Sequence, residues 1–250
     1  MKLLLQKNIE LINLIREKSC FDSVETTRII NKFFNKVPNS VNLLIRECDF
    51  HKKRVIDIGC LYGQTLLYWS KNSEGVDVSE RAIQFLKRLG INGYSFNVED
   101  GFNLLQDEKY EAIYCNNLIE HLVAPHLFLM RLNVLLRPQS GILAIGMPVT
   151  SGMFSYLWKL FGIKGWLAKE HINFFTIRTA RLTLEGAGFE IIGQWSPGLY
   201  KFSPFLGKIA VGLMPHCLFI CRKKKDFNYD KTRKYSFNPV WAKELNKLNK

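Results

Sequence analysis

A glycine turn after a short apolar run is the first feature of the sequence that could do chemistry. Residues 54–59 read RVIDIG, which is typical of a buried strand, and the turn continues to Gly63. Such a turn lets a ligand lie against bare backbone, and the amides beyond it can donate to an anionic group. Asp77 ends the next apolar run, eighteen residues after Gly59. A carboxylate at this spacing can accept hydrogen bonds from both ribose hydroxyls, so the pattern indicates a nucleoside-binding site.

Two histidines could act as a general base. His121 lies in NLIEHL after a predicted strand, and His171 lies in EHINFFT about fifty residues later. Each is a candidate because an imidazole titrates near neutral pH and can take the proton of a reacting hydroxyl group. Both also have a structural interpretation that stays open. His121 could be an orienting residue at a helix start, with Glu120 equally structural, and His171 could anchor the loop before Thr176.

The cysteines predict no metal site. Cys217 and Cys221 lie in a predicted strand, where four residues span about 13 Å, too far to share a metal ion or a disulfide. The six cysteines are scattered among apolar residues, which is typical of a reducing compartment. We therefore expect no bound metal and a cytoplasmic protein.

Short β-rich runs alternate with helical ones from residue 54 onward. This alternation predicts an α/β fold with a doubly wound, mostly parallel sheet. The helical pattern is clear over residues 64–72, 80–90 and 176–188, the last with Thr176 as N-cap and Gly188 as its stop, and a shorter helix is expected after Ser203. The predicted strands cover residues 54–59, 75–79, 94–98, 110–116, 141–148, 189–195 and 217–223.

Three parts are expected along the chain. Residues 1–50 read as N-terminal helices, with Asp22 and Asn39 as candidate N-caps and an amphipathic start that lacks the features of a signal peptide. Residues 51–223 form the α/β domain, with an aromatic-rich insertion at about 151–170. Residues 224–250 form a basic tail.

Positive charge is concentrated at the two ends of the chain. The net charge is +13, with +5 over residues 1–54, +1 over residues 55–221 and +7 over residues 222–250. A basic end is usually a solvated one, but it can also contact an anionic membrane, a phosphate-bearing substrate or RNA. We expect the tail, with a short apolar stripe around Trp241, to give weak peripheral association with anionic membranes.

The turn motif resembles that of the class I S-adenosylmethionine-dependent methyltransferases. The segment from Val55 to Gly63 matches their hydrophobic-hydrophobic-Asp-x-Gly-Cys-Gly-x-Gly pattern, except that Leu61 replaces the middle glycine. The segment IEHL at 119–122 is similar to the Leu-Glu-His-Leu of their small-molecule branch. The segments HINFFT and AGF at 171–176 and 187–189 are similar to the His-x-x-Phe-Phe-Thr and Ala-Gly-Phe of the same branch. The resemblance runs from about residue 50 to 223 and implies a Rossmann-like sheet of about seven strands whose last strand is antiparallel.

The resemblance also implies how S-adenosyl-L-methionine, the cofactor, would be held. Gly59 and Cys60 would lie along its methionine part, Asp57 would orient the loop, and Asp77 would bind the ribose. Asn97 stands where the family usually has an Asp near the adenine, and it can still accept a hydrogen bond there. The full set of expected cofactor-binding residues is Asp57, Gly59, Cys60, Gly63, Asp77, Val78, Asn97, Val98, Cys115 and Asn116.

The expected function is therefore methyl transfer to a small-molecule, glycan or lipid-linked acceptor, most simply to an oxygen. The insertion at 151–170 would cover the acceptor with aromatic side chains. An RNA methyltransferase and a non-catalytic binding protein remain alternatives. Nucleic acid is disfavoured, because the body shows no interleaved basic and aromatic patch. A dinucleotide oxidoreductase is disfavoured, because no third glycine follows Gly63 in the required place.

Overall fold

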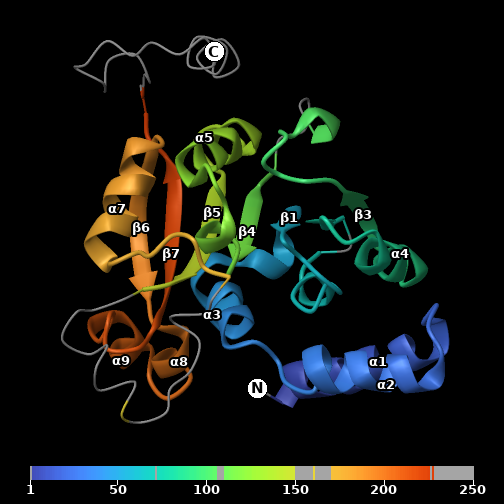
Figure 1. The fold of residues 1–250 in the computed structure, drawn as a ribbon. Coiled ribbons are helices and arrows are strands. Elements are labelled where there is room, and N and C mark those ends of the chain that lie inside the picture. The colour runs from blue at the N-terminus through green and yellow to red at the C-terminus, as the bar shows by residue number, and fades with distance from the viewer. Residues whose placement is uncertain are drawn as a thin grey trace. The chain divides into compact units, whose positions relative to one another are not determined.

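The computed structural model describes residues 2–70, 72–105, 110–149, 160, 170–225 and 227. The chain divides into two compact units, residues 1–97 and residues 98–250 (Figure 1). The aromatic insertion, apart from Leu160, and nearly all of the basic tail lie outside the described residues.

The first unit contains three parallel strands in the order β3-β2-β1. They are β1 (Val55–Ile58), β2 (Glu74–Asp77) and β3 (Asn92–Ser95). Every residue of β1 and β2 is buried, which is the pattern of parallel strands covered on both faces. The sequence therefore predicted these strands correctly, although β3 begins two residues earlier than expected because its pairing with β2 runs from Asn92 to Ser95.

Helices surround these three strands. Asp22 caps α2 as expected, since its side chain accepts the N–H of Glu25 at 2.8 Å. Asn39 is not an N-cap: Pro38 takes that position, and Asn39 is the first residue of its helix. The helices are α1 (Lys2–Lys18), α2 (Ser23–Ile29) with a π-helical turn (Ile30–Phe34), α3 (Asn39–Cys48) and α4 (Glu80–Arg88).

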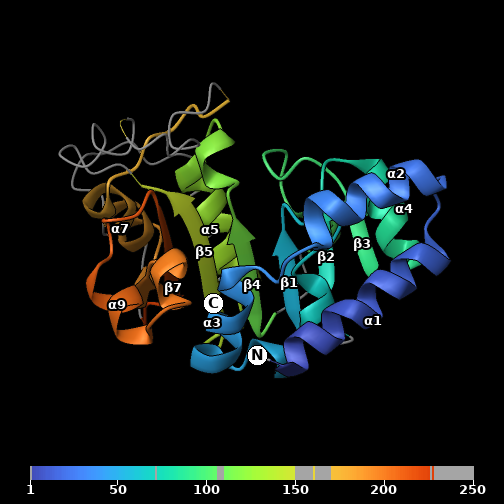
Figure 2. The same cartoon turned by 90° about the horizontal axis from the view of Figure 1, so that it is seen from below.

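The N-terminal helices are packed against α4 rather than free of it. Figure 2 shows α1 and α2 running beside α4. Ile15 of α1, Ile29 of α2 and Phe85 of α4 belong to one buried apolar cluster. Burial of such side chains stabilises the fold by about 1.5–3 kcal/mol each, so these helices are part of the first unit's core.

The predicted helix over residues 64–72 is much shorter than expected. Only a 3₁₀ turn, Leu66–Tyr68, is present, and Trp69 is already extended. The reason lies in Ser70, whose hydroxyl donates to the carbonyl of Lys53 at 2.7 Å and holds the chain beside the start of β1. A side-chain bond of this kind competes with helical hydrogen bonding.

The second unit contains four strands in the order β4-β5-β7-β6. They are β4 (Ala112–Asn116), β5 (Ile142–Pro148), β6 (Phe189–Trp195) and β7 (His216–Lys223). β4 and β5 are parallel, whereas β7 is antiparallel to both β5 and β6. The seven strands of the described residues confirm the predicted Rossmann-like class with an antiparallel last strand.

Two helices of the second unit, α7 and α9, begin at the residues that the sequence indicates. Thr176 caps α7 in a capping box with Thr179, and Gly188 follows the helix with φ of 86°. Ser203 caps α9 through the N–H of Leu206. None of the helices in the described part of the chain is long and apolar enough to cross a membrane. The helices are α5 (Pro125–Leu135), α7 (Ile177–Gly186), α8 (Pro197–Tyr200) and α9 (Pro204–Ile209).

Candidate functional site

The turn after β1 folds back onto the end of β2. The N–H groups of Gly59 and Cys60 donate to the carbonyl oxygen of Val76 at 2.8 and 3.0 Å. Gly59, Leu61 and Gly63 have positive φ, of 80°, 46° and 73°. Leu61, which stands where the resembling motif has a glycine, therefore keeps the left-handed backbone at a cost of about 1–2 kcal/mol.

Asp77 holds this turn from the end of β2. Its Oδ2 accepts the N–H of Leu61 at 2.8 Å, and its Oδ1 accepts the N–H of Ser79 at 2.9 Å. The residue is only 7% exposed. A carboxylate oxygen has two lone pairs, so each oxygen of Asp77 can accept one further hydrogen bond. The two free acceptor positions of Asp77 thus fit the two hydroxyls of a ribose, which would donate to them.

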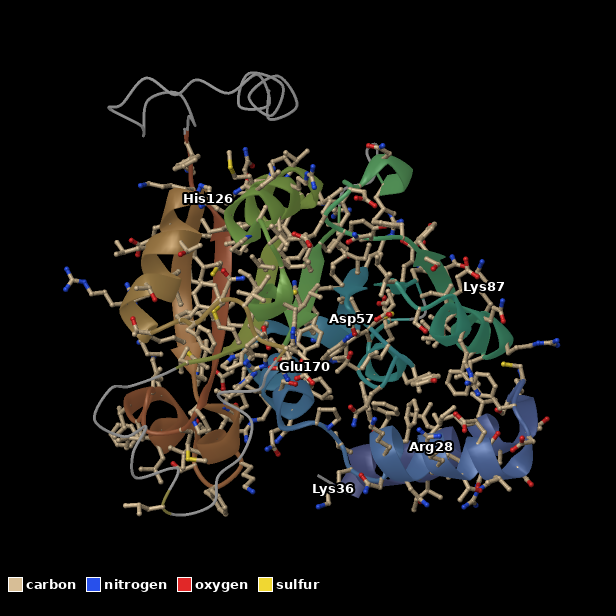
Figure 3. All side chains as sticks on the ribbon, in the orientation of Figure 1. Arg28, Lys36, Asp57, Lys87, His126 and Glu170 are labelled. Atoms are coloured by element: carbon tan, nitrogen blue, oxygen red, sulfur yellow. The ribbon has the colours of Figure 1, made fainter. Side chains whose placement is uncertain are left out.

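Asp57 connects β1 to the far side of the same turn. It is buried (Figure 3), and its Oδ2 accepts the hydroxyl proton of Thr65. Burial raises the pKa of Asp57 to about 7; the Thr65 hydrogen bond opposes this rise, and the charge of Asp77 adds to it. A cationic group bound nearby would lower this pKa again, because an opposite charge favours the ionised carboxylate.

Two further predicted cofactor residues of the first unit, Val78 and Asn97, follow the ends of β2 and β3. Val78 is 72% exposed and offers an apolar surface. Its carbonyl oxygen accepts the hydroxyl proton of Ser95 at 3.3 Å. Asn97 is exposed two residues beyond β3, and the preceding Phe96 donates its N–H to the carbonyl of Asp77 at 3.3 Å.

Tyr62 ties the turn to the N-terminal helices. Its ring centroid lies 5.2 Å from that of Phe33, 5.4 Å from that of Phe85 and 6.3 Å from that of Phe21. Gln64 adds a hydrogen bond from its side chain to the carbonyl of Lys36 at 3.1 Å. Aromatic pairs of this kind contribute about 0.5–1.5 kcal/mol each beyond their buried area. The N-terminal helices therefore help to fix the turn.

Three predicted cofactor residues belong to the second unit. Val98 is buried, and its carbonyl accepts a hydrogen bond from Arg131 at 3.3 Å. Cys115 and Asn116 are the last two residues of β4. The Oδ1 of Asn116 is buried without a hydrogen-bond partner in the described part of the chain, and a Cβ at Gly146 would collide with it. A buried polar atom of this kind is available to a ligand.

The two candidate histidines, fifty residues apart in the sequence, lie together in the second unit. The ring centroids of His121 and His171 are 4.9 Å apart, with the rings nearly perpendicular. Backbone hydrogen bonds join their segments, because the carbonyl of Glu120 accepts the N–H groups of Ile172 and Asn173 at 3.0 Å. The Nδ1 of His121 lies 3.0 Å from the carbonyl oxygen of Glu170, a residue labelled in Figure 3.

Glu120 is the most buried polar side chain of this cluster, at 1% exposed. Burial raises the pKa of its carboxyl group. Its Oε1 lies 3.9 Å from the Nε2 of His121. Cys217 and Cys221, by contrast, lie buried along β7, and burial raises the pKa of both thiols. Among the described residues of the second unit, Glu120, His121 and His171 thus bring three titratable side chains together.

Several residues that shape the site were not expected from the sequence. No sequence motif marks the bond of Thr65 to Asp57 or the packing of Tyr62. Gly75 on β2 is required because a Cβ there would come within 2.6 Å of the Cys60 sulfur. An isolated glycine inside a predicted strand is a recognised sign of such close approach, so this signal was present.

Known solved structures share this architecture. A magnesium protoporphyrin IX methyltransferase from Synechocystis with bound S-adenosylhomocysteine has TM-score 0.53 and 14% identity, covering 84% of this chain and 91% of its own. A S-adenosylmethionine-dependent methyltransferase of Thermotoga maritima has TM-score 0.55 and 19% identity, covering 80% and 95%. A methyltransferase of Haloferax volcanii, solved with an activator protein, has TM-score 0.57 and 12% identity, covering 81% and 95%.

The sequence itself matches a family model. No curated protein has a significantly similar sequence. Residues 28–194, however, match the model described as a methyltransferase domain, which is more than half of the chain. The matched range contains the turn, Asp77 and both histidines. The chain therefore belongs to the methyltransferase-domain family and is a class I methyltransferase that uses S-adenosylmethionine.

Proposed function

We propose that this enzyme methylates an oxygen atom of a small-molecule, glycan or lipid-linked acceptor. The observation that carries the proposal is the pairing of His121 and His171 at 4.9 Å beside a buried carboxylate. A nitrogen acceptor with a free lone pair needs no base, whereas a hydroxyl acceptor must lose a proton. Two imidazoles held close together can supply such a base and therefore favour a hydroxyl acceptor.

The base function is assigned to the Nε2 of His121 or to His171. The Nδ1 of His121 is positioned to donate its proton to the carbonyl of Glu170, which leaves the lone pair on Nε2. Bound S-adenosylmethionine supplies an activated methyl group, so these residues need only orient the acceptor and take its proton. The exposed ring edge of His121 is open to an acceptor, since its side chain is 36% exposed.

The cofactor is assigned to the residues that the resemblance indicated. In the first unit they are Asp57, Gly59, Cys60, Gly63, Asp77, Val78 and Asn97. In the second unit they are Val98, Cys115 and Asn116. Support comes from the spare acceptor capacity of Asp77, the exposed Val78 and the unpartnered Oδ1 of Asn116. We also keep the division into residues 1–50, 51–223 and 224–250, with an acceptor-covering insertion at about 151–170, as a proposal.

Labelled S-adenosylmethionine incubated with the full chain and fractionated cell extract tests the acceptor class. We expect the label to enter a lipid, a glycan or a small soluble pool as a base-stable methyl ether. Label in RNA would instead support the alternative of an RNA methyltransferase. No transfer to any fraction, with cofactor bound, would contradict the proposed acceptor classes. The Asp77→Ala variant provides the background in each fraction.

An anionic membrane surface is proposed as a weak partner. Residues 196–215 contain two lysines and no acidic residue. Within them Phe202 and Phe205 are 73% and 68% exposed, and Ile209 is also exposed. Aromatic and lysine side chains together favour a membrane interface. Of the basic run that begins the tail, Arg222 is already paired with Glu190 at 3.0 Å, so its charge is partly neutralised within the protein.

Vesicle sedimentation checks this association. The full chain is expected to bind vesicles of phosphatidylglycerol and phosphatidylcholine at low salt and to be released at high salt. Phe205→Ser should weaken partitioning about fivefold, corresponding to about 1 kcal/mol of lost apolar burial. The matched control is Leu182→Ser, on the exposed face of α7. Deletion of residues 226–250 should weaken binding further without affecting the cofactor. No sedimentation at low salt would contradict the proposal.

A further inference from the structure

The carboxylate of Glu120 has an unusual environment. It is 1% exposed, and neither of its oxygens has a hydrogen-bond partner among the described residues. An ionised carboxylate buried without a partner is strongly unfavourable, so such groups are paired, protonated or bound to a metal ion. A cation bound beside Glu120 would satisfy this buried carboxylate.

Ring nitrogens of two histidines lie close to this carboxylate. The Nδ1 of His121 lies 3.0 Å from the Glu170 carbonyl, which requires the ring proton on that nitrogen when the imidazole is neutral. The Nε2 lone pair of His121 then faces the Oε1 of Glu120 at 3.9 Å. Two electron pairs facing each other across this distance leave a position for a cation between them. A metal-bound histidine commonly donates its other ring N–H to a backbone carbonyl in this way.

His171 completes a set of three ligands. One ligand atom from each of Glu120, His121 and His171 lies within 4.8 Å of the others. Two ligands at about 2.1 Å from a tetrahedral metal ion are about 3.4 Å apart, so the side chains need to close by little more than about 1 Å. The side chain of His121 is 36% exposed and His171 is partly exposed, so both can make this adjustment by side-chain rotation.

The backbone around the three residues is fixed. The carbonyl of Glu120 accepts two N–H groups from residues 172 and 173 at 3.0 Å. The side chain of Asn173 donates to the carbonyl of Leu122 at 2.6 Å. These bonds hold the segment bearing His171 against the segment bearing Glu120 and His121. The backbone therefore holds the three ligands in place before a metal ion binds, as a preorganised metal site requires.

We infer that Glu120, His121 and His171 bind a divalent transition-metal cation, with zinc as the ion that best suits two imidazoles and one carboxylate. The sequence led us to expect no metal, because only the cysteines were considered as ligands. Three protein ligands leave coordination positions open, which is the arrangement of metal sites that bind a substrate or water.

The open positions point to a role in catalysis, which rests on the proposed function and makes the two histidines ligands of the cation in place of bases. A hydroxyl oxygen of the acceptor bound to the cation would lose its proton more readily, because the metal charge stabilises the alkoxide. The acceptor class is then one with a hydroxyl group accessible to the ion. Binding of the cation itself does not depend on this role.

Calorimetry with zinc chloride tests the site directly. The full chain, stripped with chelator and dialysed, is expected to bind one equivalent of Zn²⁺. Glu120→Gln and His171→Asn should each lower the affinity by at least about 10- to 100-fold, the loss typical even of outer partners. His51→Asn and Cys20→Ser are the matched controls, since both residues are exposed and lie outside the cluster. Binding that is unchanged in the Glu120 variant, or absent in the wild type, would overturn the inference.

Thermal unfolding provides a second readout that does not need an acceptor. Zinc should raise the Tm of the wild type and of both controls, since a ligand that binds only the native state stabilises it. Glu120→Gln should have a higher Tm than the wild type without metal, because an unpaired buried charge is removed, and should lose the shift with zinc. A Tm for Glu120→Gln that rises with zinc as in the wild type would contradict the site. Zinc binding without methyl transfer would refute the proposed function and leave the metal site intact.

Discussion

Replacing Asp77 with alanine is expected to weaken binding of S-adenosylhomocysteine by about 1–3 kcal/mol, or about five- to 150-fold in Kd. The direct cause is the loss of two hydrogen bonds from ribose hydroxyls to a charged acceptor. The structure adds a second cause, because Asp77 also accepts the N–H groups of Leu61 and Ser79. Without these bonds the left-handed conformation of Leu61 loses its support, so the larger end of the range is expected.

Calorimetry on the full chain measures this effect. Asp77→Asn is the informative partner variant, because an amide retains one acceptor oxygen and should lose less affinity than alanine does. Glu80→Ala is the matched control, since this exposed acid lies three residues further on in the first turn of α4. Thermal unfolding of each variant separates lost affinity from lost structure. Unchanged affinity in Asp77→Ala, or tight NADH binding by the wild type, would contradict the assignment of the cofactor site.

The strands could be predicted from the sequence because each is a short apolar run bounded by turn residues. All seven predicted strands are present, with ends shifted by at most about three residues, as is usual at element ends. Helix ends with local signals were also predicted, as Thr176 and Ser203 illustrate. The helix over residues 64–72 was wrong, since the bond from Ser70 to Lys53 that shortens it joins positions seventeen residues apart.

The cofactor turn could be predicted because its residues are consecutive or follow a fixed spacing. Gly59 and Asp77 carry their own signals, namely a glycine after a strand and an acid after the next strand. The contacts that stabilise the turn carry none. Tyr62 packs against Phe33, and Gln64 bonds to Lys36, across separations that depend on how the N-terminal helices pack. The sequence therefore indicates the residues proposed to bind the cofactor better than the residues that hold the turn in place.

The cluster of Glu120, His121 and His171 in the second unit was even harder to predict, because it depends on tertiary contacts. His121 and His171 were weighed separately as bases, and nothing in their spacing showed that they would meet. Their contact depends on backbone bonds from residues 172 and 173 to Glu120. Glu120 was interpreted as structural, but its burial without a hydrogen-bond partner among the described residues, which supports the proposed role as a metal ligand, is visible only in the tertiary structure.

Changing His121 to Gln or His171 to Asn is expected to lower turnover by about 10²-fold or more while leaving the affinity for S-adenosylhomocysteine nearly intact. The reason is that either imidazole acts on the acceptor, as a base or through a bound cation, and neither is among the proposed cofactor residues. Turnover is measured as release of labelled product with the acceptor fraction found above. The cofactor affinity is measured by calorimetry on the same preparations.

Asn173→Ala is the control that separates chemistry from anchoring. Its side chain fixes the same segment through the carbonyl of Leu122, but it offers no imidazole. If the histidines only anchor that segment, Asn173→Ala should reduce turnover and stability as much as His171→Asn does. If they take part in catalysis, Asn173→Ala should retain most of the turnover, because the backbone bonds to Glu120 still hold His171 near His121.

Equal losses in turnover, cofactor affinity and Tm in the histidine variants would contradict a catalytic role. Restoration of turnover in His171→Asn by excess zinc would then assign the histidine to the metal ion rather than to proton transfer, since added metal ion can compensate for a weakened site but not for a missing base.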